Sequence, residues 1–180
     1  MKNIIFLIAI FFASCGTCKN LTLNIQEAVF VKTQNCPENG FCSLELIPNK
    51  SIEFKTDEFG NNYPVITEGE KTLLKYSYIK KPLENTQDSN YTELIYAELD
   101  QTIKEISLTN ENLQKVKLYF GRLCYCKGET GYYEIKEGTF NLSKITEDSL
   151  NITIEFNIAE VPQIISKIDE TISLKGNATK

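Results

Sequence analysis

Alternation of apolar and polar residues in several short runs constrains the fold of this chain more than any other feature. In the clearest run, apolar side chains recur at every second position from 150 to 158: Leu150, Ile152, Ile154, Phe156 and Ile158. Successive side chains of a strand point to opposite faces of its sheet, so this pattern predicts a strand with one buried face. Similar but shorter runs lie at 52–54, 74–78, 94–96, 116–120 and 135–142.

Turn-forming residues separate these runs. They lie at 37–40, 48–50, 60–62, 84–90, 136–138 and 146–148. Short strands that are separated by turns at such regular intervals are typical of a β-sandwich or barrel. We therefore expect a mainly β protein, an antiparallel β-sandwich or barrel-like domain with at most one or two short helices. One helix could span Asn110 to Val116 after a Thr109 cap, and another could follow Pro162, where Val161, Ile165 and Ile168 have helical spacing.

The first fifteen residues differ from the rest of the chain. Lys2 is followed by an uncharged apolar run from Ile4 to Phe12, then by small residues. This order describes a secretory signal, and the run is shorter than the roughly 20 apolar residues of a membrane span.

The motif Phe12-Ala13-Ser14-Cys15 resembles the lipobox of bacterial lipoproteins, although those sequences prefer Leu where this one has Phe12. The resemblance implies cleavage before Cys15 and acylation of that cysteine. We therefore expect residues 1–14 to be a lipoprotein signal peptide, 15–20 an acylated tether and 21–180 a single β-rich domain. Two or more acyl chains on Cys15 would attach the domain stably to a membrane. The expected location is the bacterial cell envelope, anchored by lipid to the outer membrane.

The segment from Thr130 to Ile158, with Gly131-Tyr132-Tyr133 and Gly138 bounding strand-like runs, resembles the closing hairpin of uncharacterised Bacteroidota lipoproteins. That resemblance implies a β-sandwich or barrel and the same envelope address. It implies no functional residues.

Charge and composition exclude several functions. The chain has 19 Lys and Arg against 24 Asp and Glu, and its lysines form no cluster. This balance disfavours nucleic acid, which is bound by neutralising phosphates. The sequence contains no histidine, which excludes His-based nucleophile systems and disfavours catalytic zinc and blue-copper centres. We expect no catalytic residue, no metal site and no cofactor, with a carboxylate-based hydrolase as a remote alternative.

Six cysteines are present, and acylation of Cys15 would leave five in an oxidising compartment. The candidates for disulfides are Cys18, Cys36, Cys42, Cys124 and Cys126. Cys36 and Cys42 bracket a turn, so a bond between them is the first hypothesis. Cys124 and Cys126 would share one face of a regular strand, with Cα atoms too far apart for an easy bond. A bond from one of them to Cys18 or to the 36–42 turn is equally open.

Tyrosines could form a recognition surface, because aromatic side chains anchor interfaces. The candidates are Tyr76, Tyr78, Tyr119, Tyr125, Tyr132 and Tyr133. The alternative is ordinary strand packing with wet hydroxyl groups.

Two functional hypotheses follow. The first is a non-enzymatic, membrane-anchored module that binds a protein partner or supports assembly in the cell envelope. The second is a thiol-dependent envelope protein in which Cys124 and Cys126 exchange disulfides or hold Cu(I).

Overall fold

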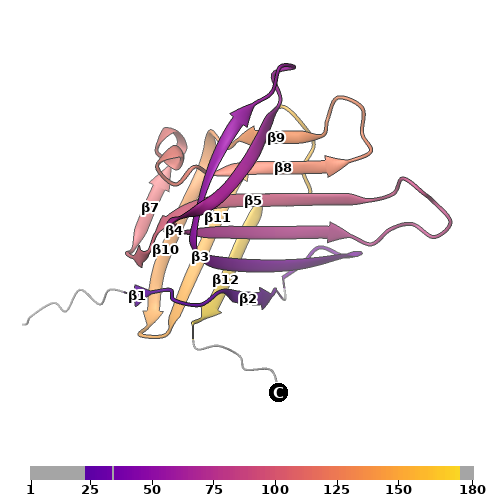
Figure 1. The fold of residues 1–180 in the computed structure, drawn as a ribbon. Coiled ribbons are helices and arrows are strands. Elements are labelled where there is room, and N and C mark those ends of the chain that lie inside the picture. The colour runs from indigo at the N-terminus through magenta and orange to yellow at the C-terminus, as the bar shows by residue number, and fades with distance from the viewer. Residues whose placement is uncertain (1–22, 34, 175–180) are drawn as a thin grey trace, which may run out of the picture.

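The computed structural model describes residues 23–33 and 35–174, and strands dominate them (Figure 1). The first strands are β1 (Leu23–Asn24), β2 (Val29–Lys32), β3 (Gly40–Thr56), β4 (Asn62–Lys80), β5 (Tyr91–Asp100), β6 (Thr102–Ile103) and β7 (Ile106–Thr109). After the 3-10 helix η1 (Asn110–Val116) come β8 (Tyr119–Cys124), β9 (Gly131–Glu134), β10 (Glu137–Thr146), β11 (Ser149–Asn157) and β12 (Lys167–Ser173).

Two antiparallel sheets form the body of the domain. The larger has the order β2-β3-β4-β5-β8-β9, and the smaller has the order β12-β11-β10-β7; β1 and β6 form a separate pair. The alternating run predicted at 150–158 is β11, whose inward residues Leu150, Ile152 and Ile154 are fully buried. They belong to one core with inward residues of the larger sheet, such as Leu44, Ile95 and Phe120. The expected sandwich architecture is confirmed.

The β3–β4 hairpin is much longer than the other hairpins and extends past the sheet that it starts in (Figure 1). A register shift between Pro48 and Lys50 interrupts its ladder. Beyond that point the hairpin pairs with β9, where Asn62 lies opposite Tyr132. This pairing closes β4, β5, β8 and β9 into a small antiparallel barrel. Both architectures considered from the sequence, sandwich and barrel, therefore occur in one domain.

The far part of the hairpin covers a second apolar cluster that lies apart from the main core. Ile52, Leu73, Leu94 and Tyr96 are its buried members. The Phe54 ring stacks on Tyr119 with 3.7 Å between ring centroids. Two polar contacts add to this packing. The Ile52 amide donates to the Glu98 carboxylate at 2.8 Å, and Lys117 Nζ donates to the Ile52 carbonyl at 2.7 Å.

Three local predictions need correction. The residues 48–50 do not end a strand, because β3 continues through them with an irregularity in the ladder, where a proline is tolerated. The first helix is confirmed at Asn110–Val116, but it is a 3-10 helix and the Thr109 side chain makes no capping hydrogen bond. The second helix is wrong: Val161 and Ile165 are buried from a loop, and Ile168 belongs to β12.

Candidate functional site

The two disulfides lie at the same end of the larger sheet. Cys36 and Cys42 are bonded, with Cα atoms 5.5 Å apart, across the turn that leads into β3. The pairing expected from the sequence is confirmed here. Cys42 is buried and lies opposite Tyr78 on β4, and Tyr78 lies opposite Glu93 on β5.

Cys124 and Cys126 are bonded to each other, with Cα atoms 5.2 Å apart. The expectation that these two cysteines would be too far apart is wrong, because it assumed a strand that continued through both. β8 ends at Cys124, and the chain turns immediately afterwards. Cys124 and Cys126 are both half-buried, whereas Tyr125 between them is 84% exposed. Cys15 and Cys18 lie outside the described residues.

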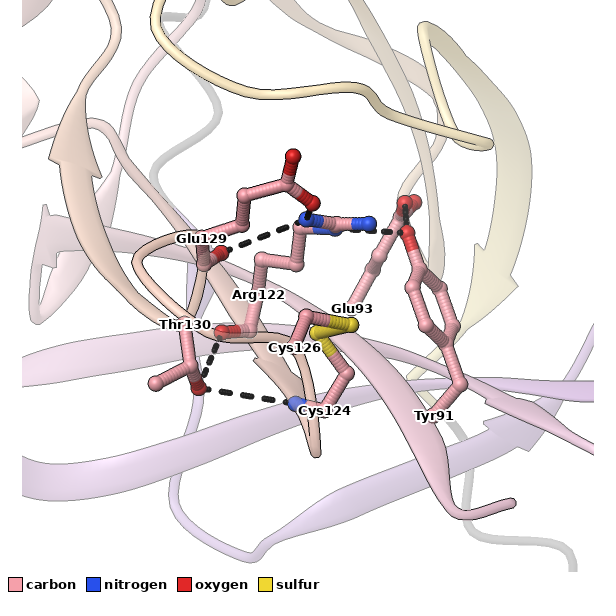
Figure 2. Close-up of a disulfide and its surroundings, with 7 residues drawn as sticks. All are labelled: Tyr91, Glu93, Arg122, Cys124, Cys126, Glu129 and Thr130. Carbon is pink, nitrogen blue, oxygen red and sulfur yellow. Dashed lines mark hydrogen bonds and ion pairs between the residues drawn. A yellow bond between two sulfur atoms is a disulfide. The ribbon is translucent and has the colours of Figure 1, made fainter. Parts of the chain in front are cut away.

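Hydrogen bonds hold the loop that follows Cys124 (Figure 2). The Thr130 hydroxyl donates to the Arg122 carbonyl at 3.0 Å and accepts from the Cys124 amide at 3.4 Å. Nη1 of Arg122 forms an ion pair with the Glu129 carboxylate and also donates to the Glu129 carbonyl. The loop is therefore fixed by side chains as well as by its disulfide.

The buried Arg122 side chain continues this network into the core (Figure 2). Its Nε donates to the Tyr91 hydroxyl at 3.3 Å, and that hydroxyl donates to the Glu93 carboxylate. Burial alone would lower the pKa of Arg122, but the hydrogen bonds to Glu129 and Tyr91 outweigh it and raise that pKa. Burial, followed by the hydrogen bond to Glu93, raises the pKa of Tyr91 to about 12.

Glu93 joins the two sheets. Its side chain is completely buried on β5, and its two oxygens accept the backbone amides of Ile164 and Ile165 at 2.6 and 2.7 Å. Those amides lie in the loop between β11 and β12. Three donors therefore satisfy this buried carboxylate, and its oxygens are occupied by hydrogen bonds within the protein. Its role is to link β5 of the larger sheet to a loop of the smaller sheet.

Glu93 and Arg122 were not among the residues predicted to matter, although the sequence carries a signal that both are buried. Glu93 has the same strand parity as Ile95, and Arg122 has the same parity as Phe120, both of which face the main core. A charged residue at an inward position of an alternating strand needs a buried partner. The partners of Glu93 were not predictable, because its two amide donors lie in a loop more than 70 residues away.

The predicted tyrosine surface is wrong. Tyr76 and Tyr78 are 2% and 1% exposed in the main core, because they lie on the inward face of β4. Tyr132 packs against the second cluster, Tyr119 stacks on Phe54 and Tyr133 packs against the main core, all three half-buried. Tyr125 is the one of the six that is largely exposed.

A separate depression of about 630 Å³ lies beside η1. Its lining residues are all polar or charged, and three of the six are acidic: Asn110, Glu111, Gln114, Glu134, Lys136 and Glu137. Two of these side chains already bond to the backbone. The Gln114 amide donates to the Leu118 and Ile135 carbonyls, and Asn110 Oδ1 accepts the Gly138 amide. These contacts give the lining a structural role in joining η1 to β10.

Among the residues that the structure describes, no helix combines the length and apolar character needed to cross a membrane. Comparisons of the chain with protein-family models, with curated proteins and with solved structures returned no match.

Proposed function

We propose that this protein is an exported lipoprotein, acylated at Cys15, whose β domain binds a protein partner in the bacterial cell envelope. The lipobox-like motif supports the anchor. The two disulfides support a location outside the cytoplasm, because disulfides persist in oxidising compartments.

The observation that carries the binding role is the exposed ring of Tyr125 on a fixed loop. The Cys124–Cys126 disulfide, the Arg122–Glu129 ion pair and the Thr130 hydroxyl all hold this loop. A rigid aromatic side chain loses little conformational entropy on binding, so it is an effective anchor for an interface. We therefore assign the binding role to the β8–β9 loop, in place of a surface made of all six tyrosines.

A comparison of two tyrosine variants in native membranes tests this role. Tyr125→Ala should lose a protein that copurifies with the wild-type chain, whereas Tyr63→Ala should retain it, because Tyr63 is also exposed but lies on the β4 hairpin. Recovery of the same proteins with both variants would contradict the proposal. Intact mass of the purified chain tests the anchor independently: it should show loss of residues 1–14 and addition of acyl chains at Cys15.

A second candidate function is thiol–disulfide exchange at Cys124 and Cys126. The observation that favours it is that these neighbouring cysteines are bonded to each other on an accessible loop. A substrate thiolate would attack one sulfur and release the other as a thiolate. A second substrate thiol would then displace the protein from the mixed disulfide, which leaves an oxidised substrate and two protein thiols. The reduced pair would also offer soft ligands for Cu(I).

Trapping separates this candidate from the binding role. Cys126→Ser should accumulate a mixed disulfide at Cys124 with an added peptide disulfide, because the Cys124 thiolate displaces one peptide thiolate and no neighbouring protein thiol then resolves the bond. Cys36→Ser, which leaves the buried Cys42 as its free thiol, should accumulate none. Failure of the oxidised wild-type chain to oxidise added dithiol would exclude exchange. If the measured mass of the reduced chain shows no bound Cu(I), Cu(I) binding by Cys124 and Cys126 would be excluded.

A further inference from the structure

The open edge of the larger sheet carries a small patch of exposed aromatic and basic side chains. We call it the β2-edge patch and define it by Phe30, Lys32, Phe41, Ile79 and Lys81. Phe30, Phe41 and Ile79 are 65%, 51% and 49% exposed. Phe41 lies directly opposite Ile79, and Lys32 follows Phe30 by two residues on the same face of β2.

The lysines of the patch are held over an aromatic ring. Lys32 Nζ lies 5.7 Å and Lys81 Nζ lies 5.4 Å from the centre of the Phe41 ring. The nearest acid on this face of β3, Glu45, is neutralised by Lys75 at 3.1 Å. The patch therefore presents positive charge around an apolar centre, on a chain whose formal net charge is −5.

We propose that the β2-edge patch rests on an anionic lipid surface. An apolar centre rimmed by lysines is the arrangement with which proteins bind such surfaces, because rings enter the interface while ammonium groups meet lipid phosphates. A second copy of the chain fits less well, since pairing the same patch face to face would bring four lysine ammonium groups together.

The position of the proposed anchor supports a lipid surface as the partner of the patch. This argument rests on the proposed acylation of Cys15. Seven residues lie between Cys15 and Leu23, the start of β1, and the eight residue steps span at most roughly 29 Å when extended. β1 and β2 are consecutive strands and lie along the same side of the domain in Figure 1. A tether that joins Cys15 to β1 would therefore start on the side of the domain that carries the patch.

This orientation has a consequence for the candidate site. β2 and β9 are the first and last strands of the larger sheet. Tyr125 follows β8, which is separated from β3 by β4 and β5, so the β8–β9 loop lies outside the patch, at the same end of the sheet. The anchor and the patch together would fix which side of the domain a partner meets.

The test uses the mature chain, residues 15–180, with Cys15→Ser so that no acyl chain contributes. The chain should sediment with vesicles of phosphatidylglycerol and phosphatidylcholine, should not sediment with phosphatidylcholine alone, and should be released by salt. Lys32→Glu with Lys81→Glu should weaken binding by roughly tenfold or more. Phe41→Ser should weaken it at any salt concentration. The control Lys104→Glu with Lys136→Glu changes charge equally at exposed positions outside the patch and should bind like the parent chain.

Absence of binding to anionic vesicles, or equal binding by the patch variants and the control, would overturn the proposal. A dimer in sedimentation velocity that Phe41→Ser dissociates would assign the patch to a second copy instead. Denaturant midpoints of all variants show whether each is folded. Acylation of Cys15 is measured separately by mass, so failure of the anchor and failure of the patch are distinguishable.

Discussion

Glu93 and Arg122 lie directly opposite each other on β5 and β8, both with buried side chains, and the Tyr91 hydroxyl joins them. The carboxylate continues to the β11–β12 loop and the guanidinium to the β8–β9 loop. One chain of contacts thus connects the exposed disulfide loop to the opposite sheet.

Removal of the Glu93 carboxylate should destabilise the domain strongly. Glu93→Ala leaves the Ile164 and Ile165 amides without their acceptor, and should lower the free energy of unfolding by about 3–5 kcal/mol. Glu93→Gln keeps one acceptor oxygen and should cost about 1–3 kcal/mol. Urea denaturation with the disulfides intact measures both. Equal losses for the two variants would show that hydrogen bonding to the loop is not the source of the effect.

Alkaline pH should weaken the same network through Tyr91. Its pKa rises from 10.0 to about 12 in the folded chain. The folded state therefore keeps a proton that the unfolded state releases above pH 10. This stabilising contribution is complete below pH 10 and is lost as the pH rises toward 12. The stability difference between wild type and Tyr91→Phe should be constant from pH 7 to 9 and shrink between pH 10 and 12, as followed by denaturant titrations.

Glu170 should show the same sign of pH dependence in the acidic range, as a buried acid that costs stability at neutral pH. Burial raises its pKa above the ordinary 4.5. Its contribution is fully favourable only below that value, and stability falls as the pH rises through the folded pKa. Glu170→Gln should therefore be more stable than wild type at pH 7, with the difference disappearing near pH 4. A variant that is less stable than wild type at both pH values would contradict this.

The two disulfides should differ in their contribution to stability. In the chain-entropy relation, the Cys36–Cys42 ring is worth about 2.4 kcal/mol and the smaller Cys124–Cys126 ring about 1.6 kcal/mol. The double Cys→Ser variant of each pair, unfolded in urea, measures these values. Partial reduction followed by mass spectrometry should show Cys124–Cys126 opening first, because Cys42 is 2% exposed. Slower reduction of Cys124–Cys126 would argue against an accessible loop.

The stacked pair of Phe54 and Tyr119 should hold the far end of the β3–β4 hairpin against the sheet. Phe54→Ala removes the stack and part of the second cluster, and should cost about 2 kcal/mol. Phe59→Ala is the matched control at the hairpin tip, where the ring is 80% exposed, and it should change stability by less than about 0.5 kcal/mol. Thermal unfolding of both variants provides the comparison.

Features that depend on neighbouring residues were predictable from the sequence. The alternation at 150–158 gave β11, the turn at Pro37 to Gly40 gave the Cys36–Cys42 pairing, and the residues 110–116 gave η1. Features that depend on the partner strand were not. Pro48 resembles a turn residue, but pairing with β4 carries the strand past it.

The candidate site was less predictable than the fold for the same reason. Whether Cys124 and Cys126 can bond depends on where β8 ends, which pairing with β5 and β9 decides. Tyr76 and Tyr78 face the core, in line with the alternation at 74–78, whereas Tyr125 belongs to no such run and is exposed. Treating all six tyrosines as one surface ignored that difference. Glu93 accepts from backbone amides that lie more than 70 residues away in the chain.

The far half of the β3–β4 hairpin covers a cluster that is separate from the main core. Such an arrangement allows sub-global opening, in which one segment detaches while the remainder keeps its native packing. Amide protons at 50–68 should then exchange with deuterated solvent sooner than those of β11, whose inward residues are fully buried. The domain would consequently possess two levels of protection against exchange, with the Pro48–Lys50 irregularity as the boundary between them.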